Sequence, residues 1–194
     1  KRFSKSNILA IDLSLNSLSY AYRKIRDFEI TNVNLMQADI LNIEKLDKKF
    51  HFIECTGVLH HMKDPIKGLE ILNKQLEYGG LMKIGLYSKN GRKELNEFKT
   101  SMNVDLDIED PKKLVSFRER IIKKYNENLP QFFLSIDFFS LSGLKDYLLN
   151  VHENQYSIDE IRLILKKFKL DFCGFEFANS NQVIREIKKT SPEF

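Results

Sequence analysis

The sequence predicts an α/β fold, a three-layer sandwich around a mostly parallel sheet. Short apolar runs that end in polar residues alternate with segments whose apolar side chains recur at helical spacing. Between residues 50 and 87 a strand, a helix and a second strand follow one another, which is the crossover unit of parallel sheets. The 194 residues are 42% hydrophobic and 30% charged, a composition typical of one globular domain.

The first 55 residues predict three strands and one helix. The strands cover residues 7–11, 33–38 and 50–55, and the first two end in front of an aspartate. The helix follows the first strand and takes Ser14 as its N-cap. Its apolar face consists of Leu15, Leu18, Tyr22 and Ile25.

A second helix has the clearest boundaries. Asp64 is its N-cap, and Pro65 takes the first helical position, where a missing N–H is tolerated. Its apolar face consists of Ile66, Leu69, Leu72 and Leu76. Gly79 and Gly80 are expected to end this helix, and residues 81–87 predict the next strand.

Residues 88–154 predict a helical insertion rather than further alternation. Helical spacing recurs over residues 114–125 and 142–151, and an aromatic cluster lies between them: Phe132, Phe133, Phe138 and Phe139. A long insertion after a core strand usually covers a site or packs as a subdomain.

The C-terminal part predicts one more helix and one more strand. Ser157 and Glu160 form a capping box, and the buried face that follows is Ile161, Ile164 and Phe168. Residues 171–177 then predict a final strand.

Composition and charge exclude several classes of function. The 31 basic and 27 acidic residues give a formal charge of +4, too even a balance to indicate a nucleic-acid partner. No apolar run is long enough for a membrane span or a signal peptide, so we expect a cytoplasmic protein with no membrane partner. The chain begins at Lys1 rather than at a methionine, which indicates a fragment or a trimmed product.

The cysteines and histidines do not predict a metal site. Cys55 and Cys173 lack metal-type spacing, and each lies in an expected buried strand as an inert thiol. His60 and His61 are neighbours that point in opposite directions from an extended segment, with no other ligand close in sequence. Each of them can instead be a structural histidine with satisfied hydrogen bonds, and for at least one of the pair this interpretation is preferred.

The residues that end the expected strands carry the functional signal, because ligands of open parallel sheets bind at the carboxyl ends of the strands. Asp12 can accept hydrogen bonds from both hydroxyls of a ribose, or it can simply cap its helix. Asp39, beside the apolar Ile40 and Leu41, can accept from an adenine amine, or it can be an exposed turn residue. Residues 54–62 are the densest functional cluster, with Gly57 allowing close backbone approach to a ligand.

At this point the sequence resembles a known family. Four segments resemble the successive motifs of class I S-adenosylmethionine-dependent methyltransferases, in order and in spacing, over about the first ninety residues: residues 8–14 (ILAIDLS), 37–40 (QADI), 50–62 (FHFIECTGVLHHM) and 78–82 (YGGLM). Later segments resemble a bacterial branch sometimes fused to tetratricopeptide repeats, so such a repeat region elsewhere in the full-length protein is expected: residues 84–88, 117–120, 139–142 and 152–153.

The resemblance implies S-adenosylmethionine as the cofactor and a Rossmann-like sheet. It implies that Asp12 holds the ribose, that Asp39 and Ile40 contact the adenine, and that the backbone around residues 54–57 lies beside the methionine part. The cofactor-binding candidates are Asp12, Leu13, Asp39, Ile40, Glu54, Cys55, Thr56 and Gly57.

Two departures from the family pattern predict truncation at both ends. The family's first strand and its glycine-rich loop are expected before Lys1, in the middle of the sheet between the strands that end at Asp12 and Glu54. The family's antiparallel last strand has no clear counterpart after residue 177. We therefore expect a partial Rossmann-like core (1–88), a helical insertion that forms an acceptor-site lid (89–155), and a C-terminal helix and strand returning to the core (156–194).

The expected reaction is methyl transfer to an unidentified acceptor, either a small molecule or a protein. His60, His61 and His152 are the candidates for a general base. Tyr87, Arg92 and Arg118 are the candidates for acceptor binding, Arg92 especially for a carboxylate or a phosphate.

Two other functions compete with methyl transfer. A non-catalytic interaction module could keep the fold without turnover, which the absence of the glycine-rich loop would favour. A nicotinamide-dependent dehydrogenase also places an acid after its second strand, but the expected catalytic Lys, Tyr or Ser constellation cannot be assembled from this sequence.

Overall fold

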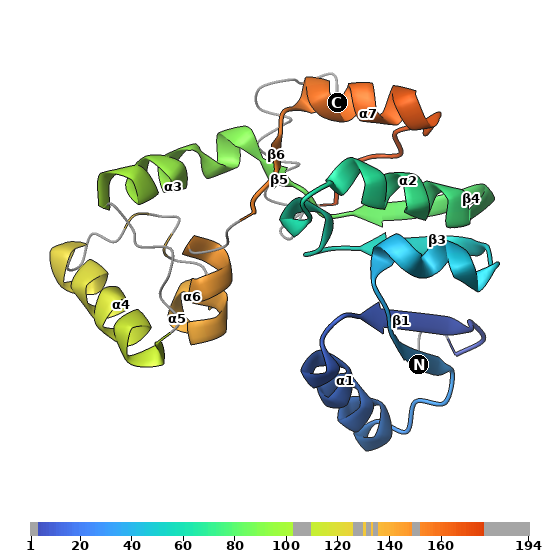
Figure 1. The fold of residues 1–194 in the computed structure, drawn as a ribbon, viewed down its shortest axis with the longest axis horizontal. Coiled ribbons are helices and arrows are strands. Elements are labelled where there is room, and N and C mark those ends of the chain that lie inside the picture. Colours follow the sequence, from blue (N-terminus) through green and yellow to red (C-terminus); the bar gives the residue numbers. More distant parts are fainter. Residues whose placement is uncertain are drawn as a thin grey trace, which may run out of the picture. The chain divides into compact units, whose positions relative to one another are not determined.

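The computed structural model describes residues 4–102, 110–125, 130, 133, 136–148 and 152–176. It divides into a larger unit, Lys1–Ser157, and a smaller unit, Ile158–Phe194. The elements of the larger unit are drawn in Figure 1 and are β1 (Ile8–Asp12), α1 (Leu15–Asp27), β2 (Val33–Gln37), η1 (Ile40–Leu46), β3 (Phe50–Cys55), η2 (Leu59–His61), α2 (Pro65–Gln75), β4 (Leu76–Ile84), β5 (Tyr87–Ser88), α3 (Lys89–Met102), α4 (Pro111–Tyr125), α5 (Ile136–Phe139), α6 (Leu141–Leu148) and β6 (Gln155–Tyr156). The smaller unit contains α7 (Ile158–Phe168).

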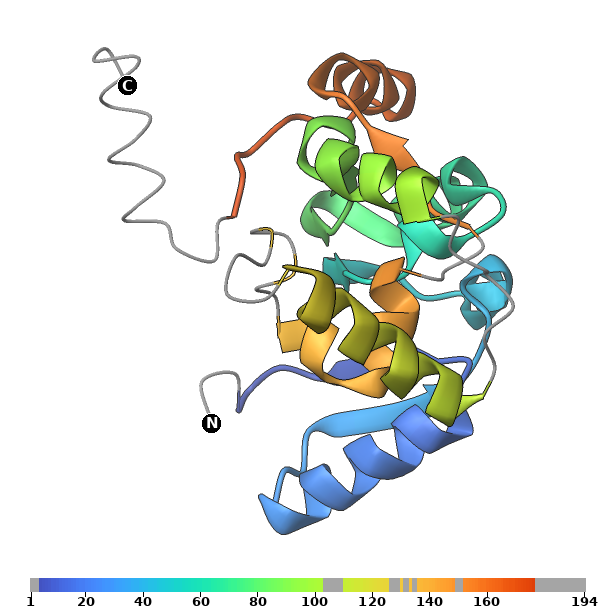
Figure 2. The same ribbon diagram turned by 90° about the vertical axis from the view of Figure 1, so that its left-hand side faces the viewer.

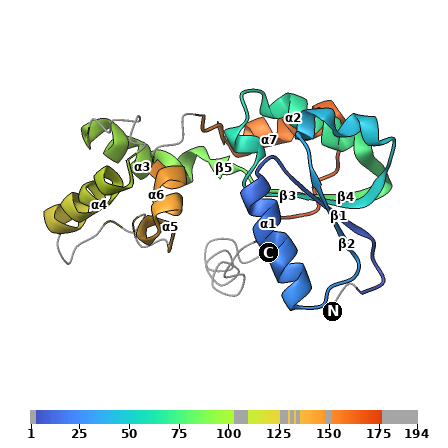
Figure 3. The same cartoon turned by 60° about the horizontal axis from the view of Figure 1, so that its bottom comes forward.

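The strands pair in parallel, as the alternation of strands and helices predicted. β1 pairs with β2 from Ile8↔Val33 to Asp12↔Gln37, and α1 lies along this pair (Figure 3). β3 pairs with β4 up to Cys55↔Ile84, with a register shift between Phe50 and Phe52. β5 pairs with β6. Among the described residues these strands form three two-stranded sheets, β1–β2, β3–β4 and β5–β6. The fold is therefore α/β with parallel strands.

The expected N-caps of α1 and α2 are present, but the boundary after α2 is not where the sequence placed it. Ser14 accepts from Ser17 N at 3.2 Å, and Asp64 accepts from Lys67 N at 2.9 Å. Helix α2 ends at Gln75 and β4 begins at once, so Gly79 and Gly80 lie inside the strand. A Cβ at Gly80 would lie 2.9 and 3.0 Å from the carbonyl oxygens of Glu77 and His51. This glycine permits a close backbone approach and does not end the helix.

The insertion has a hydrophobic core of its own. Helices α4 and α6 lie against each other, the yellow and orange helices of Figure 2. The side chains at the centre of this core are 0% exposed: Ile121, Phe133, Phe138, Leu144 and Leu148. Phe139 is 53% exposed, and Phe132 lies outside the described residues. The predicted aromatic cluster therefore serves mainly to pack the insertion itself.

The smaller unit contradicts one strand prediction. Helix α7 forms after Ser157, with Ile161, Ile164 and Phe168 half-buried. Residues 171–176 are not a strand, and residue 177 lies outside the described residues. Phe172 and Phe175 are more than half exposed and Gly174 has φ +141, so this segment neither buries its apolar side chains nor keeps an extended backbone. Cys173 is consequently exposed, whereas Cys55 is buried as expected.

Within the described parts of the chain, none of the helices has the length and apolar character needed to cross a membrane.

Candidate active site

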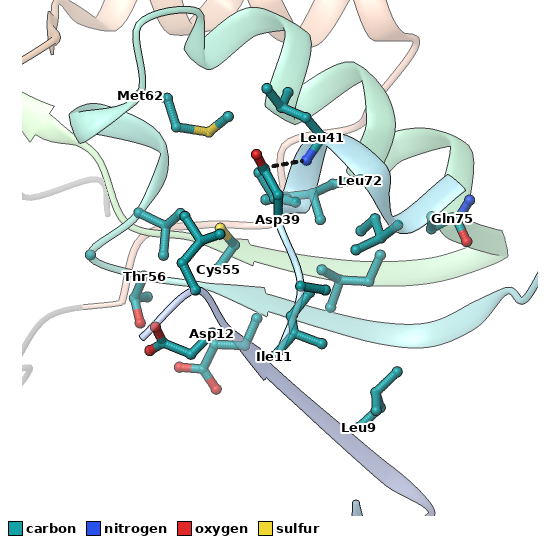
Figure 4. A pocket seen from close by; sticks show the side chains of 18 of the residues that line it. Leu9, Ile11, Asp12, Asp39, Leu41, Cys55, Thr56, Met62, Leu72 and Gln75 are labelled. Carbon is teal, nitrogen blue, oxygen red and sulfur yellow. Dashed lines mark hydrogen bonds between the residues drawn. The ribbon is translucent and has the colours of Figure 1, made fainter. Parts of the chain in front are cut away.

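A cavity of about 720 Å³ lies at the carboxyl ends of β1 and β3. Its walls come from β1, from β3 and from the segments around them, including η1 and α2 (Figure 4). Leu9 and Ile11 of β1 line it, and consecutive residues of β3, from Phe52 to Cys55, line it as well. Successive side chains of a strand point to opposite faces of the sheet, so a cavity against one face would contact only every second residue. Since consecutive residues of β3 line this cavity, it lies against the edge of the strand.

The structure brings all eight predicted cofactor-binding residues to this one cavity. They come from three separate segments, which begin at Asp12, Asp39 and Glu54. Parallel strands place their carboxyl ends at the same edge of the fold, so residues that are distant in sequence meet there. A volume of this size lies within the usual range of cofactor pockets.

Two aspartates in the cavity already bind backbone. Asp12 Oδ1 accepts from Ser14 N at 2.7 Å, at the start of α1. Asp39 Oδ1 accepts from Leu41 N at 2.8 Å and caps η1, the dashed line in Figure 4. Asp39 therefore caps a helical turn and is half-buried rather than an exposed turn residue, whereas Asp12 binds the backbone of Ser14, which is itself the N-cap of α1. An ionised carboxylate accepts several hydrogen bonds, so capping and ligand binding are compatible.

The segment after β3 supplies the opposite wall. Glu54 lies 3.0 Å from Lys83 Nζ on the neighbouring strand, with both side chains well exposed. Gly57 has φ +74, a left-handed conformation that favours glycine, and open space surrounds the position of a Cβ. Burial raises the pKa of the Cys55 thiol, against a smaller opposing effect of a backbone hydrogen bond from Leu59. Cys55 is thus a protonated, apolar wall of the cavity.

The two histidines occupy different environments. His61 lines the cavity, and its Nδ1 lies 3.1 Å from the carbonyl oxygen of His152. His60 is 4% exposed and does not line the cavity; its Nδ1 lies 3.2 Å from the carbonyl oxygen of Gly85, and its Nε2 is buried without a hydrogen-bond partner. Burial lowers the pKa of His60, and the Gly85 contact opposes that effect.

Tyr87 and Arg92 form a buried stack beside His60. The Tyr87 ring lies 3.9 Å from the His60 ring and 3.7 Å from Arg92 Cζ, and Arg92 Cζ also lies 4.7 Å from the Tyr147 ring. Arg92 Nε lies 3.2 Å from Glu153 Oε1 without the alignment of a hydrogen bond, and its Nη2 makes none. The stack joins β5, α3 and α6, and neither Tyr87 nor Arg92 lines the cavity.

Two further candidates lie outside the cavity wall. Arg118 Nη1 donates to the carbonyl oxygen of Phe139 at 2.7 Å and joins α4 to the end of α5. The His152 side chain is exposed, and the contact of this residue with the cavity wall is made by its backbone carbonyl.

Sequence reasoning did not select several residues of the site. Met62 and Lys63 line the cavity directly after the histidine pair, so their position in sequence could have indicated them. Gln75 also lines it and is 6% exposed, a lone polar residue on the buried face of α2. Asn154 contacts the histidine segment from 92 to 94 positions away, and no sequence pattern predicts such a contact.

Comparison with known proteins identifies the family. A family model described as a methyltransferase domain matches residues 1–134, which is more than half of the chain. An uncharacterised protein of Synechococcus sp. is 31% identical over 98 residues, which are 50% of this chain and 24% of the relative. An uncharacterised protein of Rickettsia prowazekii is 35% identical over 81 residues, 41% of this chain and 32% of the relative.

A tRNA U34 carboxymethyltransferase of Campylobacter curvus is 31% identical over 78 residues, 40% of this chain and 26% of the relative. The chain thus spans about a quarter to a third of the length of the curated relatives that it matches.

Solved structures show the same fold. PKMT2 from Rickettsia typhi aligns with 97% of this chain and 39% of its own, with a TM-score of 0.63 and 22% identity. Its structure in complex with AdoHcy aligns with 97% of this chain and 40% of its own, again with a TM-score of 0.63 and 22% identity. The motifs, the parallel fold and the family model agree, and the chain therefore belongs to the methyltransferase domain family, as its resemblance to class I S-adenosylmethionine-dependent methyltransferases predicted.

Proposed function

We propose that this chain binds S-adenosylmethionine in the cavity between β1 and β3 and transfers the methyl group to an acceptor. The observation that carries the proposal is the convergence of the three predicted cofactor segments on one cavity of about 720 Å³ in a member of the methyltransferase domain family. The complex of PKMT2 with AdoHcy, the demethylated product of this cofactor, supports the same choice of ligand.

The residues of the cavity fit the parts of this cofactor. Asp12 and Asp39 offer carboxylate oxygens for the ribose hydroxyls and the adenine amine. Ile40 and Leu41 offer apolar surface for the adenine ring. Glu54 and the left-handed backbone at Gly57 offer acceptors and space for the amino acid part.

The chain's own contribution to the chemistry is alignment and, for some acceptors, removal of a proton. When bound, S-adenosylmethionine supplies a methyl group already activated on a sulfonium. The protein therefore needs to hold the acceptor in line with that methyl group, which lowers the entropic part of the barrier. A base is required only where the acceptor loses a proton as it is methylated.

His61 is the best placed of the three histidines for the role of base. It is the one that lines the cavity, whereas the His60 side chain lies in the adjoining stack and the His152 side chain is exposed. A carbonyl oxygen only accepts hydrogen bonds, so the contact with His152 requires a proton on His61 Nδ1. A neutral His61 then carries its lone pair on Nε2, where it can accept a proton.

The helical insertion is our candidate for the acceptor side of the site. The segments before it supply the walls of the cavity, and residues 152–154 at its end contact the turn that carries His61. Tyr87, Arg92 and Arg118 remain proposed acceptor contacts, with Arg92 and Arg118 acting after a rearrangement that frees their guanidinium groups. The acceptor is a small molecule or a protein.

Ligand binding distinguishes this proposal from its rivals. The full-length protein is titrated with S-adenosylhomocysteine and, separately, with NAD⁺ in a calorimeter. Saturable binding of S-adenosylhomocysteine without binding of NAD⁺ supports the proposal. NAD⁺ binding would favour a dehydrogenase, and binding of neither ligand would favour an interaction module.

The acceptor side needs a second experiment. Once an acceptor is found by transfer of a labelled methyl group, we expect His152→Gln and Arg92→Lys to reduce turnover and to spare cofactor affinity. Full activity in both variants would contradict the role of these two residues.

A further inference from the structure

The segment that carries His61 is a very short turn. Element η2 covers Leu59–His61, and its N-cap residue Val58 makes no side-chain capping bond. Its backbone bonds, His61 N to Val58 O and Met62 N to Leu59 O, engage the first two carbonyls of the turn. The carbonyls of His60 and Met62 therefore require donors from elsewhere in the fold.

Asn154 supplies those donors. Its backbone N donates to His60 O at 2.8 Å, and its Nδ2 donates to His60 O at 3.2 Å and to Met62 O at 2.8 Å. Two residues earlier, His152 O accepts from His61 Nδ1 at 3.1 Å. The segment 152–154, which leads out of the insertion, thus holds the turn at three successive residues.

The other side of the turn rests on α2. A Cβ at Gly68 would lie 2.8 Å from Met62 Sδ and 2.9 Å from Leu59 Cδ2, so this helix is packed directly against the turn. With Gly68 on one side and Asn154 on the other, the position of His61 and Met62 in the cavity wall is fixed by the element that ends the insertion.

We infer that Asn154 is a positioning residue of the active site, which holds the His60–Met62 turn and sets the tautomer of His61 through the neighbouring His152 carbonyl. This inference rests on the proposed function for its consequence in catalysis. It makes the insertion part of the support of the cavity wall, so that a change in the insertion reaches this wall through residues 152–154.

The amide of asparagine is required at this position. Its Nδ2 carries two hydrogens, one for each carbonyl, and the side chain is half-buried. An aspartate of the same shape has acceptors only, so it would place a carboxylate against two carbonyl oxygens. Asn154→Asp therefore removes the two hydrogen bonds of the side chain, to His60 O and Met62 O, with almost no change in volume.

The test observes His61 directly. The chain contains four histidines, so the ring nitrogens can be assigned in long-range ¹H–¹⁵N spectra of the protein at mildly alkaline pH. We expect His61 of the wild type to carry its proton on Nδ1, and Asn154→Asp to show a mixture of tautomers. We also expect affinity for S-adenosylhomocysteine to fall about tenfold in that variant, the scale of one lost buried hydrogen bond.

A matched control and a second variant keep the test decisive. Asn34→Asp changes an asparagine of β2 whose Nδ2 also donates, to Asn7 Oδ1 at 3.2 Å, but which does not line the cavity; it should leave His61 unchanged. If Asn154→Asp does not fold, Asn154→Ala removes the side-chain donors without introducing a charge. A folded variant at position 154 with the wild-type His61 spectrum would overturn the inference. Failure of the full-length wild type to bind S-adenosylhomocysteine would instead overturn the proposed function, and the histidine spectra would still decide the role of Asn154.

Discussion

Asp12 combines two roles that the sequence could not separate. Its Oδ1 accepts from Ser14 N, yet the same residue lines the cavity at the carboxyl end of β1. A carboxylate that accepts a backbone hydrogen bond at a ligand site is pre-positioned, because this bond fixes its rotamer before any ligand arrives. Both roles predict that substitution of Asp12 lowers the stability of the protein or of its complex. Only the position in the cavity wall predicts a loss of affinity for the cofactor.

The first prediction concerns that affinity. Asp12→Ala is expected to weaken binding of S-adenosylmethionine to the full-length protein by about 1 to 3 kcal/mol, the scale of a lost charged acceptor, and Asp12→Glu should weaken it less. Calorimetric titration measures the effect. Asp27→Ala, which removes an exposed aspartate of α1 outside the cavity, is the control. Equal affinity in wild type and Asp12→Ala would leave the hydrogen bond to Ser14 as the only role of Asp12.

The second prediction concerns pH and His60. Burial lowers the pKa of His60 in the folded state below its ordinary value of 6.5. Above that value both folded and unfolded His60 are neutral, and the histidine adds no pH dependence. As the pH falls below it, the unfolded state binds the proton first, so the free energy of unfolding decreases.

Denaturant unfolding at about pH 7.5 and about pH 5.5 measures this loss. His60→Gln should lose less stability over that interval than the wild type. The exposed His51 offers a control, because the free energy of unfolding of His51→Gln should depend on pH as it does in the wild type. The same loss in the His60 variant as in the wild type would show that another group is responsible.

At the scale of elements, the insertion is stabilised by a core separate from the strands. Phe133 is 0% exposed and its ring lies 4.8 Å from the ring of Phe98 and 4.5 Å from that of Phe138. Phe139 is 53% exposed on the end of α5. The two phenylalanines therefore provide a buried and an exposed version of the same substitution.

The third prediction uses this pair. Phe133→Ala should lower the free energy of unfolding by about 3 to 5 kcal/mol, because it removes a large side chain and leaves a cavity. Phe139→Ala should change it by less than about 1 kcal/mol. Urea unfolding followed by circular dichroism compares the two variants with the wild type. Similar losses in both would mean that the core does not centre on Phe133.

At the scale of the whole molecule, the strand pairs β1–β2 and β3–β4 flank the cavity without pairing with each other in the described residues. The family resemblance places a further strand, followed by a glycine-rich loop, between the strands that end at Asp12 and Glu54. That strand would add ladder partners for β1 and β3, and the loop would add backbone donors for the cofactor.

The fourth prediction follows from that resemblance. We expect the 194-residue chain to bind S-adenosylmethionine poorly or not at all, and to unfold at a lower temperature than a version extended upstream. Thermal unfolding of both proteins with and without the cofactor tests this. If the cofactor raised the unfolding temperature of both proteins equally, the resemblance would have misplaced the further strand and its glycine-rich loop.

The sequence predicted which strand-end residues meet at the cavity better than it predicted the contacts between distant segments, for a physical reason. Asp12, Asp39 and Glu54 each lie at or just after the carboxyl end of an apolar strand, and parallel strands bring such ends together without further information. The contact between Asn154 and Met62 joins distant segments that carry no periodic pattern. Arg92 was expected at a binding surface because of its charge, but its guanidinium is packed between two tyrosine rings.

The errors in the fold have a similar origin. Residues 171–177 are apolar enough for a strand, yet apolarity does not supply a pairing partner, and Gly174 interrupts the extended backbone. Gly79 and Gly80 look like a helix terminator in the sequence, although Gly80 is required for close packing inside β4. Local pattern fixes the periodicity of an element more reliably than its ends.

The pairing of β5 with β6 has an evolutionary consequence. Tyr87 lies opposite Gln155 and Ser88 opposite Tyr156, so the polypeptide leaves the strand region and returns to it at adjacent points. Because loop-closure entropy grows only slowly with length, a segment whose ends are already neighbours can be lengthened, shortened or exchanged at small thermodynamic cost. We therefore expect residues 89–154 to tolerate replacement by another segment. Recombination at these two points would give the methyltransferase domain a different insertion, provided that the incoming segment retains an amide donor at the position of Asn154.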